Sequence, residues 1–231
     1  MTQKICVSIL PKTITEAQRL VRKAEQNQAD LIEVRLDNLE QTINLSELPK
    51  NTKTPLIATN KPQTKKNNPT TTSTSDEKGQ QTLLDAAMAG FQYVDVDFFS
   101  PKRDETVTKL KQLGTKPIVS YHKFDGILGV SALEKILDEQ LASGAAVCKI
   151  VLTANQMEDN LPILSFISFA STRAKLVCFC MGRAGKPSRL LSPVFGAYFT
   201  FAALEYGDET APGQMTIADM RTAYEMLGIE P

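Results

Sequence analysis

The sequence predicts an α/β protein of the (β/α)8 TIM-barrel class, and three observations carry that prediction. Short β-branched segments alternate with longer helical patterns through the 231 residues. Strict alternation of strand and helix is typical of a parallel sheet covered by helices, and eight such units fit a barrel. The first strand-to-helix turn reads Leu10-Pro-Lys-Thr-Ile14. It lacks the glycines that an open doubly wound sheet usually carries there, so the barrel is favoured over that alternative.

The expected elements follow one another along the whole chain, with a short helical piece near Leu45–Leu48. The expected strands are Ile5–Leu10, Leu31–Asp37, Pro55–Thr59, Tyr93–Phe99, Pro117–His122, Val147–Leu152, Leu176–Met181 and Tyr198–Leu204. The expected helices are Thr15–Gln28, Asp76–Ala89, Arg103–Leu113, Ser131–Ser143, Gln156–Ser171, Pro187–Phe195 and Ile217–Leu227. Together they predict one catalytic barrel domain over residues 1–231.

Composition argues against several classes of protein. Lys+Arg and Asp+Glu both number 26, so nothing suggests nucleic acid or an anionic membrane as a partner. No apolar run reaches transmembrane length and Met1-Thr-Gln-Lys4 leads straight into a strand, so we expect a cytoplasmic protein. The single histidine argues against a Cys/His zinc site. The four cysteines lie in apolar segments, where we expect buried free thiols.

One polar segment interrupts the pattern. Residues 61–79 read KPQTKKNNPTTTSTSDEKG, which is too polar to bury apolar surface. We expect a mobile loop after the third strand, on the catalytic face of a barrel. A functional lid and a plain surface insertion both fit this composition.

Ionisable side chains occur at alternate positions inside the expected strands. They are Glu33, Arg35, Asp37, Asp95, Asp97, His122 and Lys149. Alternate positions share one face of a strand. A half-solvated antiparallel sheet shows the same alternation, but the helical patterns between the strands argue against it. In a parallel barrel the apolar face meets the helices, so the charged face points inward, where charges must pair. Such a cluster indicates a functional site.

Lys149 is the candidate nucleophile of this cluster. An ammonium group in an apolar strand loses hydration, which lowers its pKa and makes the neutral amine available for Schiff-base chemistry. A lysine paired with a core carboxylate would show the same spacing, so both interpretations stay open. His122 ends the preceding strand and would neighbour Lys149. It would either move protons near neutral pH or cap the strand as a polar residue.

The segment from Met181 to Arg189 contains glycines between a strand and a helix. It lacks the glycine spacing of a P-loop and the Ser or Thr after the lysine, so a nucleotide-phosphate loop is excluded. Backbone N–H groups at the helix start, with Arg189 in its first turn, could hold an anion. A plain helix-entry loop is the alternative. The later segment Thr210-Ala-Pro-Gly-Gln214 has a turn composition.

Taken together, these segments resemble the type I 3-dehydroquinate dehydratase family. The matching pieces are Glu33-Val-Arg-Leu-Asp37, Tyr93-Val-Asp-Val-Asp97, Ser120-Tyr-His122, Lys149-Ile-Val151, Met181-Gly182, Ser188-Arg189, Phe195-Gly196 and Ala211-Pro-Gly-Gln214. Their order and spacing cover nearly the whole chain. The family fold is a (β/α)8 barrel, in agreement with the alternation of elements.

The resemblance implies a mechanism and a set of site residues. Lys149 forms an imine with the ring ketone of 3-dehydroquinate, and His122 moves the protons that lead to syn loss of water. Asp97 occupies the position of a family glutamate that orients the histidine, and its side chain is one methylene shorter. The implied substrate-binding residues are Glu33, Arg35, Lys61, Met181, Arg189, Phe195, Thr210 and Gln214. Arg189 is the carboxylate ligand among them, and Lys61 stands where the family usually has an arginine.

The resemblance also implies a small-molecule substrate, no metal or organic cofactor, and a homodimer without nucleic-acid or membrane partners. The loop from Tyr206 to Gln214 is expected to be mobile and to close over substrate, and a static turn is the alternative. A class I aldolase is a competing function, which the lack of a phosphate loop after the last strands disfavours. A catalytically inactive barrel that binds a small acid is another, which the presence of both Lys149 and His122 disfavours.

Overall fold

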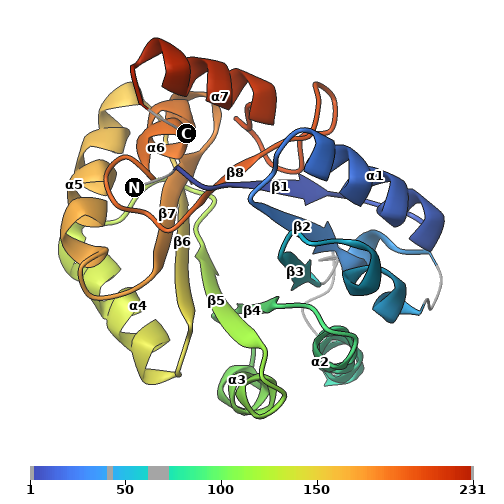
Figure 1. Ribbon diagram of the computed structural model, residues 1–231. Coiled ribbons are helices and arrows are strands. Elements are labelled where there is room, and N and C mark those ends of the chain that lie inside the picture. The colour runs from blue at the N-terminus through green and yellow to red at the C-terminus, as the bar shows by residue number, and fades with distance from the viewer. Residues whose placement is uncertain (1–2, 41–43, 62–72, 230–231) are drawn as a thin grey trace.

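Eight parallel strands alternate with helices and form a nearly closed barrel in the computed structural model, which describes residues 3–40, 44–61 and 73–229 (Figure 1). The strands are β1 (Ile5–Ile9), β2 (Leu31–Arg35), β3 (Leu56–Thr59), β4 (Tyr93–Asp97), β5 (Lys116–His122), β6 (Val147–Thr153), β7 (Leu176–Met181) and β8 (Thr200–Ala202). The helices are α1 (Ile14–Gln26), α2 (Ser73–Met88), α3 (Arg103–Gln112), α4 (Val130–Ala142), α5 (Asn160–Ala170), α6 (Lys186–Leu191) and α7 (Ile217–Met226). None of the helices in these ranges is long and apolar enough to cross a membrane.

Neighbouring strands pair in parallel in the order β7-β6-β5-β4-β3-β2-β1-β8. β8 pairs with β1 over three residues, from Thr200 opposite Ile5 to Ala202 opposite Val7. Among the described residues no ladder joins β7 to β8, and the Tyr198 backbone N donates to Leu176 O at 2.7 Å where the two strands begin. The barrel therefore has one open side, which we name the β7–β8 seam. The predicted (β/α)8 fold is confirmed, and the open doubly wound alternative is wrong.

The two faces of each strand divide as the sequence predicts. Apolar residues such as Val34 and Ile150 pack outward against the helices in two large clusters. A third cluster, which includes Ile57, Ile118 and Val177, fills the barrel interior. The charged residues Glu33, Asp95 and Lys149 lie on the interior face near the middle of their strands, where they contact one another. The prediction that the charged residues at alternate strand positions face the barrel interior is thus confirmed.

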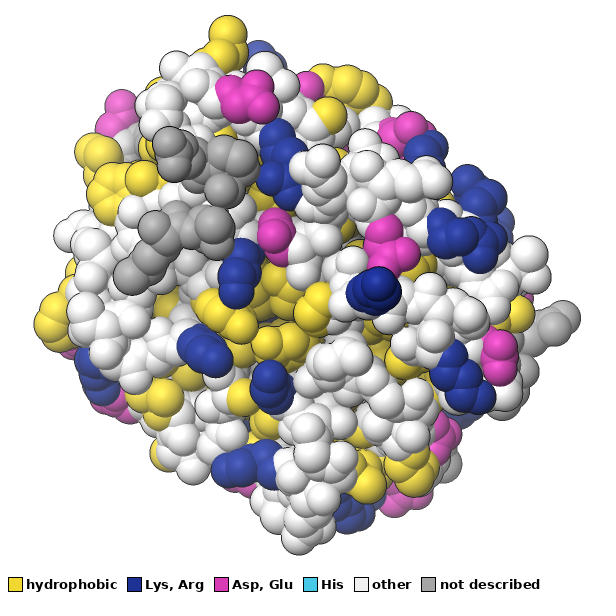
Figure 2. Space-filling model, viewed as in Figure 1, with side chains coloured by type: hydrophobic (Ala, Val, Ile, Leu, Met, Phe, Trp, Pro, Cys, Tyr) yellow, Lys and Arg dark blue, Asp and Glu magenta, His cyan; other side chains and the backbone are white. Residues whose placement is uncertain are grey.

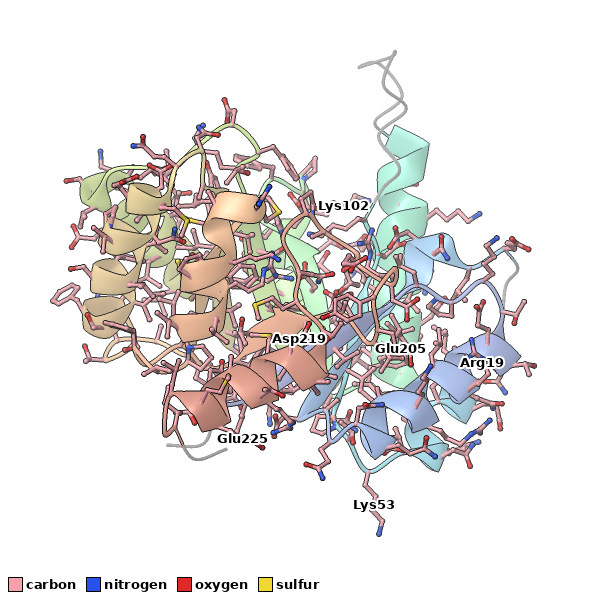
Figure 3. The ribbon with its side chains drawn as sticks, turned by 90° about the horizontal axis from the view of Figure 1, so that it is seen from above. Arg19, Lys53, Lys102, Glu205, Asp219 and Glu225 are labelled. Atoms are coloured by element: carbon pink, nitrogen blue, oxygen red, sulfur yellow. The ribbon has the colours of Figure 1, made fainter. Side chains whose placement is uncertain are left out.

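The two ends of the barrel differ in side-chain character. Figures 1 and 2 look onto the end where the strands begin, and Figure 2 shows a hydrophobic centre there, surrounded by Lys and Arg side chains with some acidic side chains among them, and no histidine on this face. In the side view of Figure 3, Lys53, which precedes β3, and Lys102, which follows β4, lie at opposite ends. The loops that follow the strands gather at the Lys102 end, where active sites of such barrels occur.

Several predicted boundaries differ from the structure. The polar segment 61–79 was expected to be a loop, but α2 begins at Ser73, so its last part is helical; residues 62–72 lie outside the described ranges. α2 is anchored by buried Leu83 and Ala86, and the helix extends from this packed part into the polar segment. The helix expected over Gln156–Ser171 begins with a separate 3₁₀ turn, Met157–Asp159, before α5.

A buried amide on α4 joins the two strands that carry the candidate lysine and histidine. Gln140 Nε2 donates to Val119 O in β5 and to Lys149 O in β6, each at 2.9 Å. Gln140→Leu removes both hydrogen bonds. It also removes Oε1, which is buried without a hydrogen-bond partner among the described residues, so part of the lost stability is recovered. The free energy of unfolding should fall by about 1–2 kcal/mol in urea titration. The exposed Gln112→Leu is the control, and equal stability of the two variants would contradict this role.

Candidate active site

Lys149 lies inside the barrel on β6, and its amine has two carboxylate neighbours. Nζ is 2.9 Å from Asp95 Oδ2 and 3.6 Å from Glu33 Oε1. It also lies 4.3 Å from the centroid of the Phe201 ring, and only 5% of the residue is exposed. Lys149 is therefore a paired lysine in this structure, and the pairing holds its amine in one position.

The expected pKa of Lys149 needs correction. Burial lowers the pKa of this amine, as its place in an apolar strand predicts. Asp95 and Glu33 outweigh burial, however, so the pKa lies above its ordinary value. The amine is protonated at neutral pH in this structure. The partners come from β2 and β4, so the β6 sequence alone does not show them.

Asp95 is the centre of the ionic cluster, although sequence reasoning gave it no role. Its Oδ1 accepts from Ser120 Oγ at 2.6 Å and from Lys61 Nζ at 3.2 Å, while Oδ2 faces Lys149. Burial raises the pKa of Asp95, but Lys149 and Lys61 outweigh it and hold that pKa well below its usual range. Its alternation with Asp97 in β4 was the signal that could have identified it. Lys61, a predicted substrate ligand, belongs to this cluster.

Glu33 lies in the middle of β2 and Arg35 at its end, and they have different partners. Glu33 accepts from Ser8 Oγ at 2.5 Å and from Thr59 Oγ1 at 2.8 Å, in addition to its contact with Lys149. Arg35 forms a two-bonded pair with Asp37, at 2.9 and 2.7 Å. Burial lowers the pKa of Arg35, but Asp37 outweighs it and raises that pKa. Glu33 is therefore part of the lysine cluster, and Arg35 is held beside it.

His122 ends β5, one strand away from Lys149, and is half-buried. Its ring stacks on Phe124 with centroids 6.3 Å apart. Burial lowers the pKa of His122 well below its ordinary value, and the cations Lys61 and Lys149 lower it further. The imidazole is therefore neutral at pH 7 and able to accept a proton.

Asp97 lies at the end of β4, and its contacts are not with the histidine. One carboxylate oxygen is 3.5 Å from Lys61 Nζ, and the other accepts from the Phe99 backbone N at 2.9 Å. Among the described residues no hydrogen bond joins Asp97 to His122. The orienting role expected for Asp97 stays a prediction, and its observed contact is with Lys61.

Arg189 enters the site through the β7–β8 seam. It is carried by α6, only 1% of it is exposed, and its guanidinium lies 4.3 Å from the centroid of the Phe179 ring. One Nη donates to Phe201 O at 3.5 Å, while Nε and the other Nη are buried without a partner among the described residues. Burial lowers the pKa of Arg189 to about 9, so it remains charged at neutral pH. A buried cation with unused donors is suited to an anionic group.

Of the two residues expected as apolar walls of the pocket, one lies inside the barrel and the other does not. Met181 ends β7 inside the barrel and is 6% exposed. Phe195 is 40% exposed and lies between α6 and β8, on a connection that returns to the end where the strands begin. The structure does not bring Phe195 to the cluster. Phe201 in β8 lies there instead, beside both Lys149 and Arg189. Motif order alone does not distinguish the two phenylalanines.

The loop from Tyr206 to Gln214 is held by its own contacts and by β7. Gln214 Oε1 accepts from the Thr210 backbone N at 2.6 Å, and Gln214 Nε2 donates to Thr210 Oγ1 at 3.1 Å. Gly182 N donates to Pro212 O at 3.0 Å. Gly213 has φ +76°, and a Cβ there would lie 2.1 Å from Gly182 O, so only glycine fits. The loop therefore docks beside the end of β7.

Comparison with known proteins agrees with this arrangement. The family model for type I 3-dehydroquinase matches residues 5–231. The 3-dehydroquinate dehydratase of Pyrococcus abyssi is 32% identical over 97% of this chain and 98% of its own, and that of Desulfotalea psychrophila is 30% identical over 95% and 96%. The solved 3-dehydroquinate dehydratase of Geobacillus kaustophilus has the same fold, with a TM-score of 0.84 and 21% identity over 99% of this chain and 92% of its own. The chain belongs to the type I 3-dehydroquinase family.

Proposed function

We propose that the chain dehydrates 3-dehydroquinate to 3-dehydroshikimate, in the shikimate pathway, through an imine on Lys149. Family membership and the relatives named 3-dehydroquinate dehydratase support the reaction. The observation that supports the imine is the Lys149 amine, which is buried in the barrel between two carboxylates. An amine held in this way is positioned to attack a ketone carbon.

The ammonium group of Lys149 first passes a proton to the neutral His122, and the free amine then attacks the ring ketone and forms a carbinolamine. His122 returns this proton to the carbinolamine hydroxyl, which leaves as water, and the nitrogen lone pair forms the protonated imine. This cation carries the charge that the ammonium group carried before. Asp95 and Glu33 therefore stabilise it through the same contacts that raise the pKa of Lys149.

His122 is the proposed proton carrier. The protonated imine withdraws electrons from the neighbouring carbon, His122 removes a proton there, and the C–H electron pair forms an enamine. The enamine expels the hydroxyl group, which receives the proton from His122 and leaves as water. A second water hydrolyses the conjugated imine, which releases the enone and restores the amine. A histidine with a lowered pKa enters this sequence unprotonated, as a base must.

The remaining residues are proposed to hold the substrate. Arg189 has buried, unused donors, which support a role as the ligand of the substrate carboxylate. Glu33 and Arg35 are proposed to bind ring hydroxyls, and Lys61 is proposed to supply a second cation near them. Met181 would be an apolar wall, and Thr210 and Gln214 would contact the substrate from the docked loop. A homodimer, a cytoplasmic location, a single domain over 1–231 and a mobile loop stay predictions.

Trapping tests the imine. Borohydride added with 3-dehydroquinate should reduce the imine to a stable amine, and peptide mass spectrometry should place the adduct on Lys149. Lys149→Ala should abolish formation of the ultraviolet-absorbing enone, and Lys149→Arg should not restore it, because a guanidinium cannot form the imine. Lys135→Ala, at an exposed position on α4, is the control. An adduct on Lys61 instead would reassign the nucleophile.

The pH dependence of kcat/KM tests His122. Protonation of the base stops catalysis, so the acid limb should lie below the ordinary histidine pKa of 6.5. Lys61, Lys149 and Arg35 lower the pKa of this histidine, while Asp95 raises it. Lys61→Met should therefore move the limb to higher pH, and Lys61→Arg should keep it in place.

His122→Ala is the reference for that profile. It should lose about 10²-fold in turnover and should lack the acid limb altogether. Near-normal turnover in this variant, or an unmoved limb in Lys61→Met, would exclude His122 as the titrating base.

Arg189→Lys tests the carboxylate site. The ammonium group of lysine cannot form the two parallel hydrogen bonds that a guanidinium makes with a carboxylate, so KM should rise about tenfold while kcat changes little. Circular dichroism and the melting temperature should show an intact fold. An unchanged KM combined with a lower melting temperature would mean that Arg189 only supports the seam.

A further inference from the structure

Two tyrosines meet across the end of the barrel where the strands begin, opposite the proposed active site. Tyr93 opens β4, Tyr198 lies just before β8, and their hydroxyl oxygens are 3.1 Å apart. Tyr93 is 5% exposed and Tyr198 is half-buried, so the pair closes the apolar interior at this end. The proposed reaction uses neither residue.

Three lysines surround this tyrosine pair. The Nζ atoms of Lys4 and Lys175 lie 5.1 and 5.0 Å from the centroid of the Tyr198 ring, and that of Lys116 lies 5.4 Å from the centroid of Tyr93. Each precedes or opens a different strand: β1, β7 and β5. They belong to the end of the barrel where Figure 2 shows basic side chains around a hydrophobic centre. We name these five residues the Tyr–Lys cluster.

The positive charge of this cluster is not balanced by acidic side chains. Among the described residues, no carboxylate lies within 4.0 Å of any of the three amines. Asp30, next to the start of β2, is engaged by the Ile5 backbone N at 2.8 Å and by Arg221 at 3.6 Å. Aromatic rings attract ammonium groups but carry no net charge. The three amines of the cluster therefore keep their positive charge without an ion-pair partner in the described part of the chain.

One of the two tyrosine hydroxyl groups can donate a further hydrogen bond. Two phenols carry two hydrogens, and their mutual bond uses one of them. In the described part of the chain, the other hydrogen has no acceptor. The same positive field acts on Tyr198: burial raises its pKa, but the bond with Tyr93 and the three lysines together lower it. A donor inside a positive field is a favourable place for an anion.

The backbone beneath the lysines is held by strand hydrogen bonds. Lys116 is the cross-strand partner of Tyr93, and the Thr200 backbone N donates to Lys4 O at 3.0 Å. The Tyr198 backbone N bonds to Leu176 O, next to Lys175. The three lysine side chains therefore start from backbone that is fixed by the sheet, and their amines lie beside the two tyrosine rings.

We propose that the Tyr–Lys cluster binds a small, doubly charged oxyanion of the phosphate type, either the free ion or a phosphate monoester. Three ammonium groups supply point charges and the spare hydroxyl supplies a directed donor, which suits an anion with three or more acceptor oxygens. A monovalent halide offers no such set of acceptors. Occupancy would link β1, β4, β5, β7 and β8 at the base of the barrel and so raise its stability.

Thermal melting tests this site directly. Sodium phosphate, and in a second series methyl phosphate, should raise the melting temperature saturably, whereas sodium chloride at equal ionic strength should not. Tighter binding of the monoester would assign the site to a phosphorylated compound, and tighter binding of phosphate to the free ion.

Lys116→Met and Lys175→Met should each raise the half-saturating concentration about tenfold, the effect of one lost charge-assisted contact. Both positions are exposed, so the fold should tolerate these changes.

Matched variants separate this site from the active site. Lys135→Met removes an exposed lysine elsewhere and should leave the half-saturating concentration unchanged, as should Arg189→Lys. Tyr198→Phe should weaken binding as well. The proposal fails if stabilisation follows ionic strength alone. It also fails if the half-saturating concentration is unchanged in Lys175→Met, or is lost only in Arg189→Lys, which would place the anion at Arg189.

Discussion

The ion pair between Asp95 and Lys149 is the constraint on which the site depends. Two opposite charges taken out of water cost several kcal/mol each, and their attraction compensates only with good geometry and further hydrogen bonds. Here Ser120 and Lys61 satisfy the second oxygen of Asp95, and Glu33 provides the lysine with another carboxylate. Loss of one partner would leave a buried charge unpaired, at a cost of about 3–5 kcal/mol. The cluster therefore depends on the barrel, because the alternate strands β2, β4 and β6 bring Glu33, Asp95 and Lys149 together in its interior.

The charges of the interior are distributed unevenly, in a way that suits a keto acid. Lys61 and Lys149 are balanced by Asp95 and Glu33, so the part of the site around the Lys149 amine is close to neutral. Arg189 contacts the backbone of Phe201, and within the described ranges no carboxylate forms an ion pair with it. A substrate with a neutral ketone and an anionic carboxylate complements both parts. Two aromatic rings lie between these cations: Phe201 contacts Lys149 and Phe179 contacts Arg189, with ring centroids 6.0 Å apart. They help to exclude water from both buried cations.

Much of this could be predicted from local pattern, and the remainder depended on long-range contacts. Alternation of strand and helix, and of apolar and charged residues within strands, was enough for the barrel and for Lys149 on its inner face. Asp95 was not identified as the partner of Lys149, and the direction of the Lys149 pKa was wrong, because both depend on which side chains meet across the barrel interior. Phe195 was expected at the site from the resemblance alone, and the structure places it between α6 and β8, away from the cluster. The last part of the polar segment, from Ser73, is helical although its composition is typical of a loop, because it extends a helix that is packed further along, at Leu83 and Ala86.

The β7–β8 seam has a consequence for how the chain acquires its structure. β8 pairs only with β1, through three residues that lie about two hundred positions away in sequence. Closing a loop of that length is entropically expensive, and a three-residue ladder returns little in exchange. We therefore expect the barrel to close late in folding, after the first seven strands have formed a curved sheet. The contact of Arg189 with the carbonyl of Phe201 needs β8 in place, so the Arg189 guanidinium is positioned only in the closed barrel. A chain that lacked β8 would place Lys149, Asp95 and Glu33 on its sheet without fixing Arg189 beside them.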